Sequence, residues 1–140
     1  MTEQYSTPAG PGPVDPGLVT YTHVIYALHA LSAAIGILGA ASIVGSFVFG
    51  VPSIVAVIMN YARRSDVRGT WLDSHFGWQI RTFWYALLMA TIVFLLSLPL
   101  MIVFVGFFTA AIGIFVIGLW IVYRVARGWL ALNDRRPVGA

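Results

Sequence analysis

The sequence contains no cysteine, no lysine and few charged residues of either sign. Without cysteine it has no disulfide, no thiolate metal site and no cysteine nucleophile. Charged residues make up 9% of the 140 residues and hydrophobic residues 59%, whereas soluble domains carry about 25% charged residues. Because so few charges cannot cover a water-exposed surface, lipid is expected to be the main solvent of this chain.

The second of two long uncharged stretches runs from Thr82 to Tyr123. A membrane-spanning helix needs about 20 apolar residues, so this stretch is long enough for two. The pattern predicts helices near 71–98 and 103–130, with the break between them bracketed by Pro99 and Gly106.

The first uncharged stretch, 16–62, is long for one helix and short for two. Gly50 and Pro52 interrupt it, and proline kinks or ends a helix. We expect one span over about 22–48, followed by a shorter helix over 52–63; the alternative is a hairpin of two short helices. The sequence therefore predicts an all-α integral membrane protein of three transmembrane helices with a broken or kinked first apolar segment, or alternatively four helices.

The termini differ in composition from the apolar middle of the chain. Four of the seven prolines fall before residue 17, which favours an extended, flexible chain. We therefore expect a Pro/Gly-rich tail at 1–20, a helical membrane domain at 21–132 and a C-terminal tail at 133–140.

All eight basic residues are arginines, and they fall at the ends of the apolar stretches. Those around the central loop are Arg63, Arg64, Arg68 and Arg81, and those after the last span are Arg124, Arg127, Arg135 and Arg136. The positive-inside rule predicts a multi-pass protein of the bacterial inner membrane with a cytoplasmic central loop and C-terminus. Three spans place the N-terminal tail outside, and the four-helix alternative places it inside.

Small residues recur at the spacing that lets helices approach closely in lipid. The pairs are Gly36–Ala40, Ala41–Gly45 and Gly106–Ala110. We expect these residues to pack helices within the chain, with an oligomer interface as the alternative.

The densest polar and aromatic segment is 60–85. Thr70 and Asp73 have the spacing of a helix capping box, which predicts a helix start there. The candidate cytoplasmic contact motif comprises Arg68, Trp71, Asp73, His75, Trp78, Gln79, Arg81 and Trp84. The simpler interpretation is an aromatic and arginine belt at the membrane interface. The functional one is a polar site of His75, Gln79 and Arg81 that binds a lipid phosphate or a partner's carboxylate.

The arginines also suggest lipid contacts, whereas the histidines suggest no metal site. Candidate lipid-contact residues are Arg63, Arg64, Arg124 and Arg127. With three spans, His23 and His29 lie about 30 Å from His75, across the bilayer; with four helices all three share one side. We predict no catalytic residues, no metal and no cofactor, and nucleic acid is not an expected partner.

Three segments of the chain resemble a family of small bacterial multi-span membrane proteins of unknown function. The main one is the motif RGTWLDSHFGWQIRTFW (68–84), and the others are MNYARRSDV (59–67) before it and GWLALNDRRPV (128–138) after it. That family is distantly similar to the Tic-type component of the chloroplast inner-envelope import apparatus. The resemblance implies about three helices and a cytoplasmic motif, and it supplies no catalytic residues. Gly77 stands where the family usually has a basic residue.

The sequence thus predicts a non-enzymatic scaffold or accessory subunit that acts through helix packing and the motif at 68–84. A transport or protein-translocation component is one alternative, and an anionic-lipid-binding or lipid-sensing protein is another. Expected partners are membrane lipids and either a second copy of the chain or another membrane protein.

Overall fold

The computed structural model describes residues 13–39 and 50–139, and in these ranges the chain forms four helices and no strands. They are α1 (Pro16–Gly39), α3 (Val51–Ala62), α4 (Leu72–Met101) and α5 (Val105–Asn133). The helices α1, α4 and α5 are long and apolar enough to cross a membrane. The chain is therefore an all-α, multi-pass membrane protein, as its sequence predicts, with a short helix between the first and second long ones.

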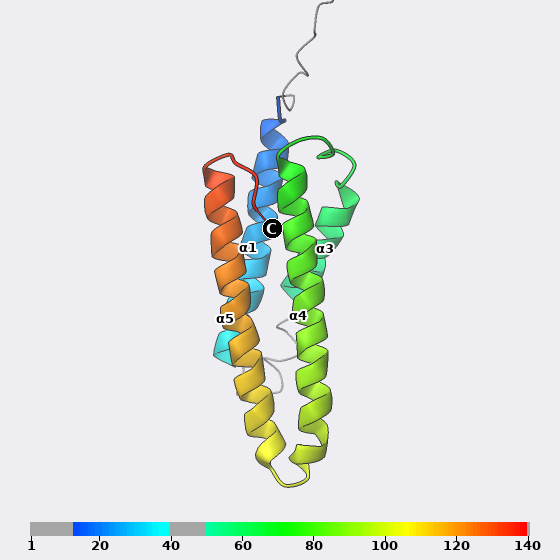
Figure 1. The fold of residues 1–140 in the computed structure, drawn as a ribbon, viewed down its shortest axis with the longest axis vertical. Coiled ribbons are helices and arrows are strands. Elements are labelled where there is room, and N and C mark those ends of the chain that lie inside the picture. The colour runs from blue at the N-terminus through cyan, green and yellow to red at the C-terminus, as the bar shows by residue number, and fades with distance from the viewer. Residues whose placement is uncertain (1–12, 40–49, 140) are drawn as a thin grey trace, which may run out of the picture.

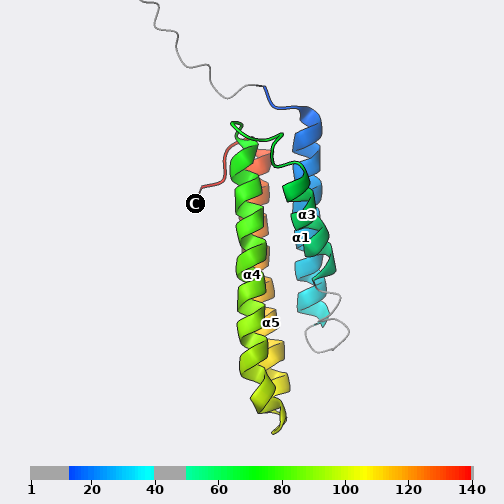
Figure 2. The same cartoon turned by 90° about the vertical axis from the view of Figure 1, so that its right-hand side faces the viewer.

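The helices α1 and α3 run antiparallel. The Tyr21 hydroxyl of α1 donates to the carbonyl of Met59 near the end of α3, at 2.8 Å, whereas His29, further along α1, bonds Ser53 near the start of α3. Figures 1 and 2 show α3 returning beside α1. The hairpin alternative therefore describes this segment, and the start of α1 lies at the same end as the central loop, where the four-helix alternative places it.

One end of the bundle consequently carries the start of α1, the loop 63–71 and the end of α5 (Figure 1). We call it the arginine end, because all eight arginines lie in this loop, in the first ten residues of α4, in the last ten residues of α5 or directly after α5. Beyond the level at which α1 and α3 stop, α4 and α5 are the only helices among the described residues (Figure 2). We call that part, residues 91–116, the distal hairpin.

Local sequence explains where the helices begin and end. Pro16 starts α1, and the Asp15 carboxylate accepts the Gly17 N–H at 2.7 Å, which is the usual capping arrangement. The helix therefore begins before the expected boundary at residue 21. Between α4 and α5 the turn falls at 102–104, where Phe104 has a φ of 63°. Pro99 lies inside the end of α4, and the helix ends two residues later, at Met101.

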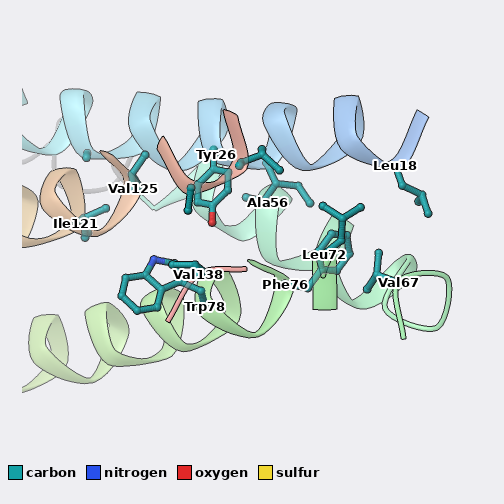
Figure 3. Close-up of a cluster of buried hydrophobic side chains, with 14 of the residues drawn as sticks. Leu18, Tyr26, Ala56, Val67, Leu72, Phe76, Trp78, Ile121, Val125 and Val138 are labelled. Atoms are coloured by element: carbon teal, nitrogen blue, oxygen red, sulfur yellow. The ribbon is translucent and has the colours of Figure 1, made fainter. Parts of the chain in front are cut away.

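The buried core lies at the arginine end. Figure 3 shows it as a cluster in which Tyr26 of α1, Phe76 and Trp78 of α4 and Val125 of α5 face one another. The predicted small-residue packing is partly visible: Gly106 is in contact with the backbone of α4, and Gly118 with Ile37 of α1. The pair Ala41–Gly45, and Ala40 of the first pair, lie outside the described residues.

Candidate functional site

A hydrogen-bonded chain of three elements crosses the arginine end. The Tyr26 hydroxyl lies 2.9 Å from Nδ1 of His75, and Nε2 of His75 lies 2.8 Å from the carbonyl oxygen of Arg136. Because a carbonyl only accepts, Nε2 carries a hydrogen. In the neutral ring Nδ1 then accepts from Tyr26, so one buried imidazole connects α1, α4 and the segment after α5.

This chain of contacts depends on a close approach at Gly128. A Cβ at that position would overlap the Tyr26 hydroxyl and ring. The Tyr26 ring stacks on Trp129, with centroids 6.3 Å apart, and the Trp129 indole N–H donates to Nδ1 of His23 at 2.8 Å. Glycine at 128 therefore lets the aromatic face of α1 lie directly on α5.

The segment after α5 folds back onto α4. Arg135 has a φ of 52°, which reverses the chain direction. The Val138 N–H then donates to the Ser74 hydroxyl at 3.1 Å, and the Val138 side chain is buried in the core. The expected C-terminal tail is thus part of the packed arginine end as far as Val138.

Further along α4, an arginine of α5 lies between two tryptophans. The guanidinium carbon of Arg124 lies 3.8 Å from the Trp78 ring centroid and 5.1 Å from that of Trp120. Its Nε donates to the Thr82 hydroxyl at 2.7 Å, and the Trp78 indole donates to the Arg124 carbonyl at 3.0 Å. Cation–π contacts and the bond from Nε therefore hold the Arg124 guanidinium in one place.

Two further arginines accompany Arg124. The guanidinium carbon of Arg127 lies 5.7 Å from the Trp78 ring centroid, and Arg127 donates to the Tyr123 hydroxyl. Arg81 is within electrostatic range of Arg124. We call Arg81, Arg124 and Arg127 the arginine triad, and it brings three positive charges together on one side of α4 and α5.

Ion pairs with carboxylates form elsewhere at this end. In 13–39 and 50–139 the structure has two of them, Arg63 with Asp66 at 3.1 Å and Arg136 with Asp134 at 3.2 Å, and both are exposed. Neither involves the triad. The triad therefore concentrates three positive charges without a carboxylate partner in the part of the chain that the structure describes, and such a group is suited to an anionic ligand.

The structure divides the predicted contact motif by exposure. His75, Trp78 and Gln79 are buried, Trp71 and Asp73 are partly buried, and Arg68, Arg81 and Trp84 are exposed. A cytoplasm-facing site made of His75, Gln79 and Arg81 is therefore wrong, because the first two point into the bundle. The reason is helical geometry: positions 75, 78, 79 and 82 form one face, and α1 and α5 cover it.

The predicted helix start at 70–73 is right, but its capping is simpler than a capping box. The Thr70 hydroxyl accepts from the backbone N–H of Leu72 at 3.2 Å rather than from that of Asp73. Trp84 donates its indole N–H to the Tyr61 hydroxyl at 3.1 Å. Trp84 thereby joins α4 to α3 at the membrane-facing surface.

The four predicted lipid-contact arginines form two groups. Arg124 and Arg127 belong to the triad, whereas Arg63 is paired with Asp66 and lies 5.6 Å from the Tyr21 ring centroid. Arg64 follows it in the loop after α3. Only the first group combines several unpaired charges with aromatic support.

The histidines are closer together than three spans would allow. Because α1 starts at the arginine end, Tyr26 contacts His75, and His23 lies within electrostatic range of it. The arrangement is the one expected for four helices, with the histidines on one side, and not the separation across the bilayer expected for three spans. Even so, no group of three or more His, Asp or Glu side chains in the described ranges could hold a metal ion.

Sequence reasoning missed Tyr26, Trp120 and Gly128 as parts of this end of the bundle. A signal was present on α5, where Trp120, Arg124 and Arg127 recur at helical spacing and Gly128 precedes an interfacial tryptophan. Pairing these positions with α1 required knowing that α1 and α5 are neighbours, which no local pattern indicates.

Comparison of the chain with family models, with curated proteins and with solved structures finds no match to any of them.

Proposed function

We propose that this chain is a non-enzymatic protein of the bacterial inner membrane whose arginine triad binds the phosphate of anionic lipids. The observation that carries the proposal is the Arg124 guanidinium, which is stacked on Trp78 and fixed through Thr82 but has no carboxylate partner in the described ranges. Arg81 and Arg127 add charge at the same place. Guanidinium groups match phosphate oxygens in geometry as well as charge.

Helix length supports a lipid rather than a soluble phosphate. From Thr82 to Met101, α4 continues for about 20 residues, or about 30 Å, which equals the thickness of the hydrocarbon core. On α5 the segment from Val105 to Tyr123 is almost as long. The triad would then lie at the level of the head groups, with aromatic residues at the interface beside it.

The same alignment supports a cytoplasmic arginine end. The turn between α4 and α5 contains no Arg or Lys, whereas the opposite end carries every basic residue. The positive-inside rule then assigns the loop 63–71, the start of α1 and the segment after α5 to the cytoplasm. The resemblance to small bacterial membrane proteins at 68–84 agrees with an inner-membrane location.

Lipid binding is tested by native mass spectrometry of the purified protein titrated with phosphatidylglycerol and, for comparison, phosphatidylcholine. The variant Arg124→Gln/Arg127→Gln is compared with Arg68→Gln/Arg135→Gln, which removes the same charge from exposed positions outside the triad. At about 1 kcal/mol per arginine, the first variant should bind phosphatidylglycerol at least about tenfold more weakly. The second should bind within about threefold of wild type.

Two outcomes would contradict the proposal. Equal losses in both variants would mean that diffuse charge, not the triad, attracts the lipid. Unchanged binding in the triad variant would exclude the proposed site.

A scaffold or accessory subunit is the second candidate, because the distal hairpin exposes apolar side chains over most of its surface, Phe94, Leu96 and Phe108 among them. Gly106 of the small-residue pattern, like Gly113 and Gly118, contacts a helix of the same chain, so these glycines lend that function no support. A transport role has less structural support than a scaffold role. Ser97 and Thr109 of the long spans bond each other at 3.0 Å, so their hydroxyls do not line a polar path.

A further inference from the structure

The arginine triad holds more positive charge than its surroundings neutralise. The groups within electrostatic range of the Arg124 guanidinium are Arg81, Arg127 and the hydroxyls of Tyr26 and Tyr85. Tyrosine is neutral at physiological pH, and no carboxylate of the described ranges is among these groups. Like charges repel more strongly near a hydrocarbon layer than in bulk water. The more negative charge a ligand brings to the triad, the more of this repulsion it removes.

The carboxylates in 13–39 and 50–139 are engaged elsewhere or distant. Asp66 and Asp134 pair with arginines outside the triad, and Asp15 accepts a hydrogen bond at the start of α1. Asp73 precedes Arg81 by eight residues, which is about 12 Å along a helix. The described part of the chain therefore leaves the charge of the triad to be balanced from outside.

Two of the three guanidiniums lie at one tryptophan. The guanidinium carbons of Arg124 and Arg127 lie 3.8 Å and 5.7 Å from the Trp78 ring centroid, so they are at most about 9.5 Å apart. Of the Arg124 nitrogens, Nε alone has a hydrogen-bond partner in the described ranges, and neither terminal nitrogen is a buried atom without a partner. Both terminal nitrogens are therefore accessible, and arginines this close can donate to the same phosphate.

Lipid phosphates differ in the charge that they would bring. A phosphodiester carries one negative charge on two free oxygens. A phosphomonoester has three acceptor oxygens, a second pKa of about 6 and a charge of about −1.5 to −2 at neutral pH. A phosphomonoester therefore neutralises up to one more arginine from the same position and accepts more hydrogen bonds.

We propose that the arginine triad selects a lipid phosphomonoester, of which phosphatidic acid is the simplest, over phosphodiester lipids. The inference rests on the proposed function, because it takes the lipid site at the triad and adds the chemical class of the head group. A cardiolipin brings two charges on two separate phosphates. Arg124 and Arg127 meet at one ring, which favours a single phosphate.

Short-chain lipids with identical chains isolate the effect of the head group. The purified full chain in mild detergent is titrated by microscale thermophoresis with dioctanoyl phosphatidic acid and dioctanoyl phosphatidylglycerol, at pH 8 and at pH 5. At pH 8 phosphatidic acid should bind at least about fivefold more tightly, which is what one further charge contributes at a membrane surface. At pH 5, below the second pKa of about 6, the preference should fall below about twofold. Phosphatidylglycerol keeps one charge at both pH values, so its affinity reports any titration of the protein itself.

Two exposed arginines provide a matched pair of variants. Arg81→Gln removes one charge of the triad and should reduce the preference at pH 8 to about twofold or less. Arg68→Gln removes the same charge outside the triad and should leave the preference as in wild type. Arg124→Gln/Arg127→Gln should weaken the binding of both lipids. Near-ultraviolet circular dichroism establishes that each variant is folded.

The possible failures can be told apart. Equal affinity for the two lipids at pH 8, with both weakened in Arg124→Gln/Arg127→Gln, would overturn the phosphomonoester inference and leave the lipid site in place. Unchanged binding of both lipids in that variant would remove the lipid site as well. A preference that persists at pH 5 would contradict selection by charge. Equal binding of a short-chain cardiolipin would place the charges on two phosphates, and equal binding of glycerol 3-phosphate would identify a soluble ester; either result overturns the inference.

Discussion

The arginine end and the distal hairpin are parts of the same two long helices, yet they bury their side chains very differently. In α4, seven of the eight buried residues lie between Leu72 and Thr82, and the eighth is Ser97. The arginine end buries large residues such as Phe76 and Trp78, whereas the distal hairpin exposes Phe94, Leu96 and Phe108.

The difference follows from what surrounds each part. Near water, the hydrophobic effect favours burial of large apolar side chains. In hydrocarbon that force between helices is absent, and close backbone packing at small residues takes its place. Accordingly, Gly106 and Gly113 of the distal hairpin lie against α4 with no room for a Cβ. The comparison teaches that one helix pair is stabilised by two different kinds of contact along its length.

The largest expected effect comes from truncating a leucine in each part. Leu72→Ala removes a fully buried side chain at the arginine end and should lower the free energy of unfolding by about 2–5 kcal/mol. Leu96→Ala, at a position 67% exposed in the distal hairpin, should change it by no more than about 0.5 kcal/mol. Unfolding by sodium dodecyl sulfate in mixed micelles, followed by circular dichroism, measures both. Similar losses in the two variants would remove the distinction between the two parts.

Composition and hydropathy are enough to predict the helical membrane class and the positions of α4 and α5, whereas α1 begins at Pro16 instead of near residue 22. The predicted helices near 71–98 and 103–130 correspond to α4 and α5, and the one at 52–63 to α3. These succeed because apolar length and helix-ending residues are local properties. The direction of α3 was left open, because it depends on contacts such as Tyr21 with Met59, which are remote in sequence.

The site was predicted less well than the fold. The sequence indicates that 68–84 is the densest polar and aromatic part of the chain. It does not indicate that the side chains of this segment divide between the core and the surface. In the structure His75 and Gln79 face the core and Arg81 faces outward. Helical periodicity separates these faces, but it does not say which face the neighbouring helices cover. Identifying the triad also required α5, whose Arg124 reaches across the helix interface to α4.

An intermediate effect is expected from adding a single methyl group at two glycines. Gly128→Ala places a Cβ against the Tyr26 ring and hydroxyl, so it should cost about 1–3 kcal/mol through overpacking. In Gly77→Ala the nearest atom to the new Cβ is a terminal nitrogen of Arg81 at 3.6 Å, which is ordinary contact. That variant should be neutral or more stable by up to about 1 kcal/mol, because alanine favours the helix. Thermal unfolding in detergent distinguishes the two, and a Gly128→Ala protein as stable as wild type would show that α1 and α5 have more room there than the structure gives them.

The smallest expected effects come from one polar contact in each part. Tyr26→Phe removes a hydroxyl and leaves His75 Nδ1 buried without a donor, which should cost about 1–2 kcal/mol. Ser97→Ala removes the hydroxyl that bonds Thr109, whose own hydroxyl still donates to the Gly106 carbonyl. Hydrogen bonds between membrane helices average about 0.6 kcal/mol, so Ser97→Ala should cost about that much. The same detergent titration measures both variants, and hydrogen exchange adds a second readout, because loss of the Tyr26 contact should speed exchange in the segment after α5 that His75 holds. If Ser97→Ala cost more than Tyr26→Phe, polar contacts rather than glycine packing would stabilise the distal hairpin.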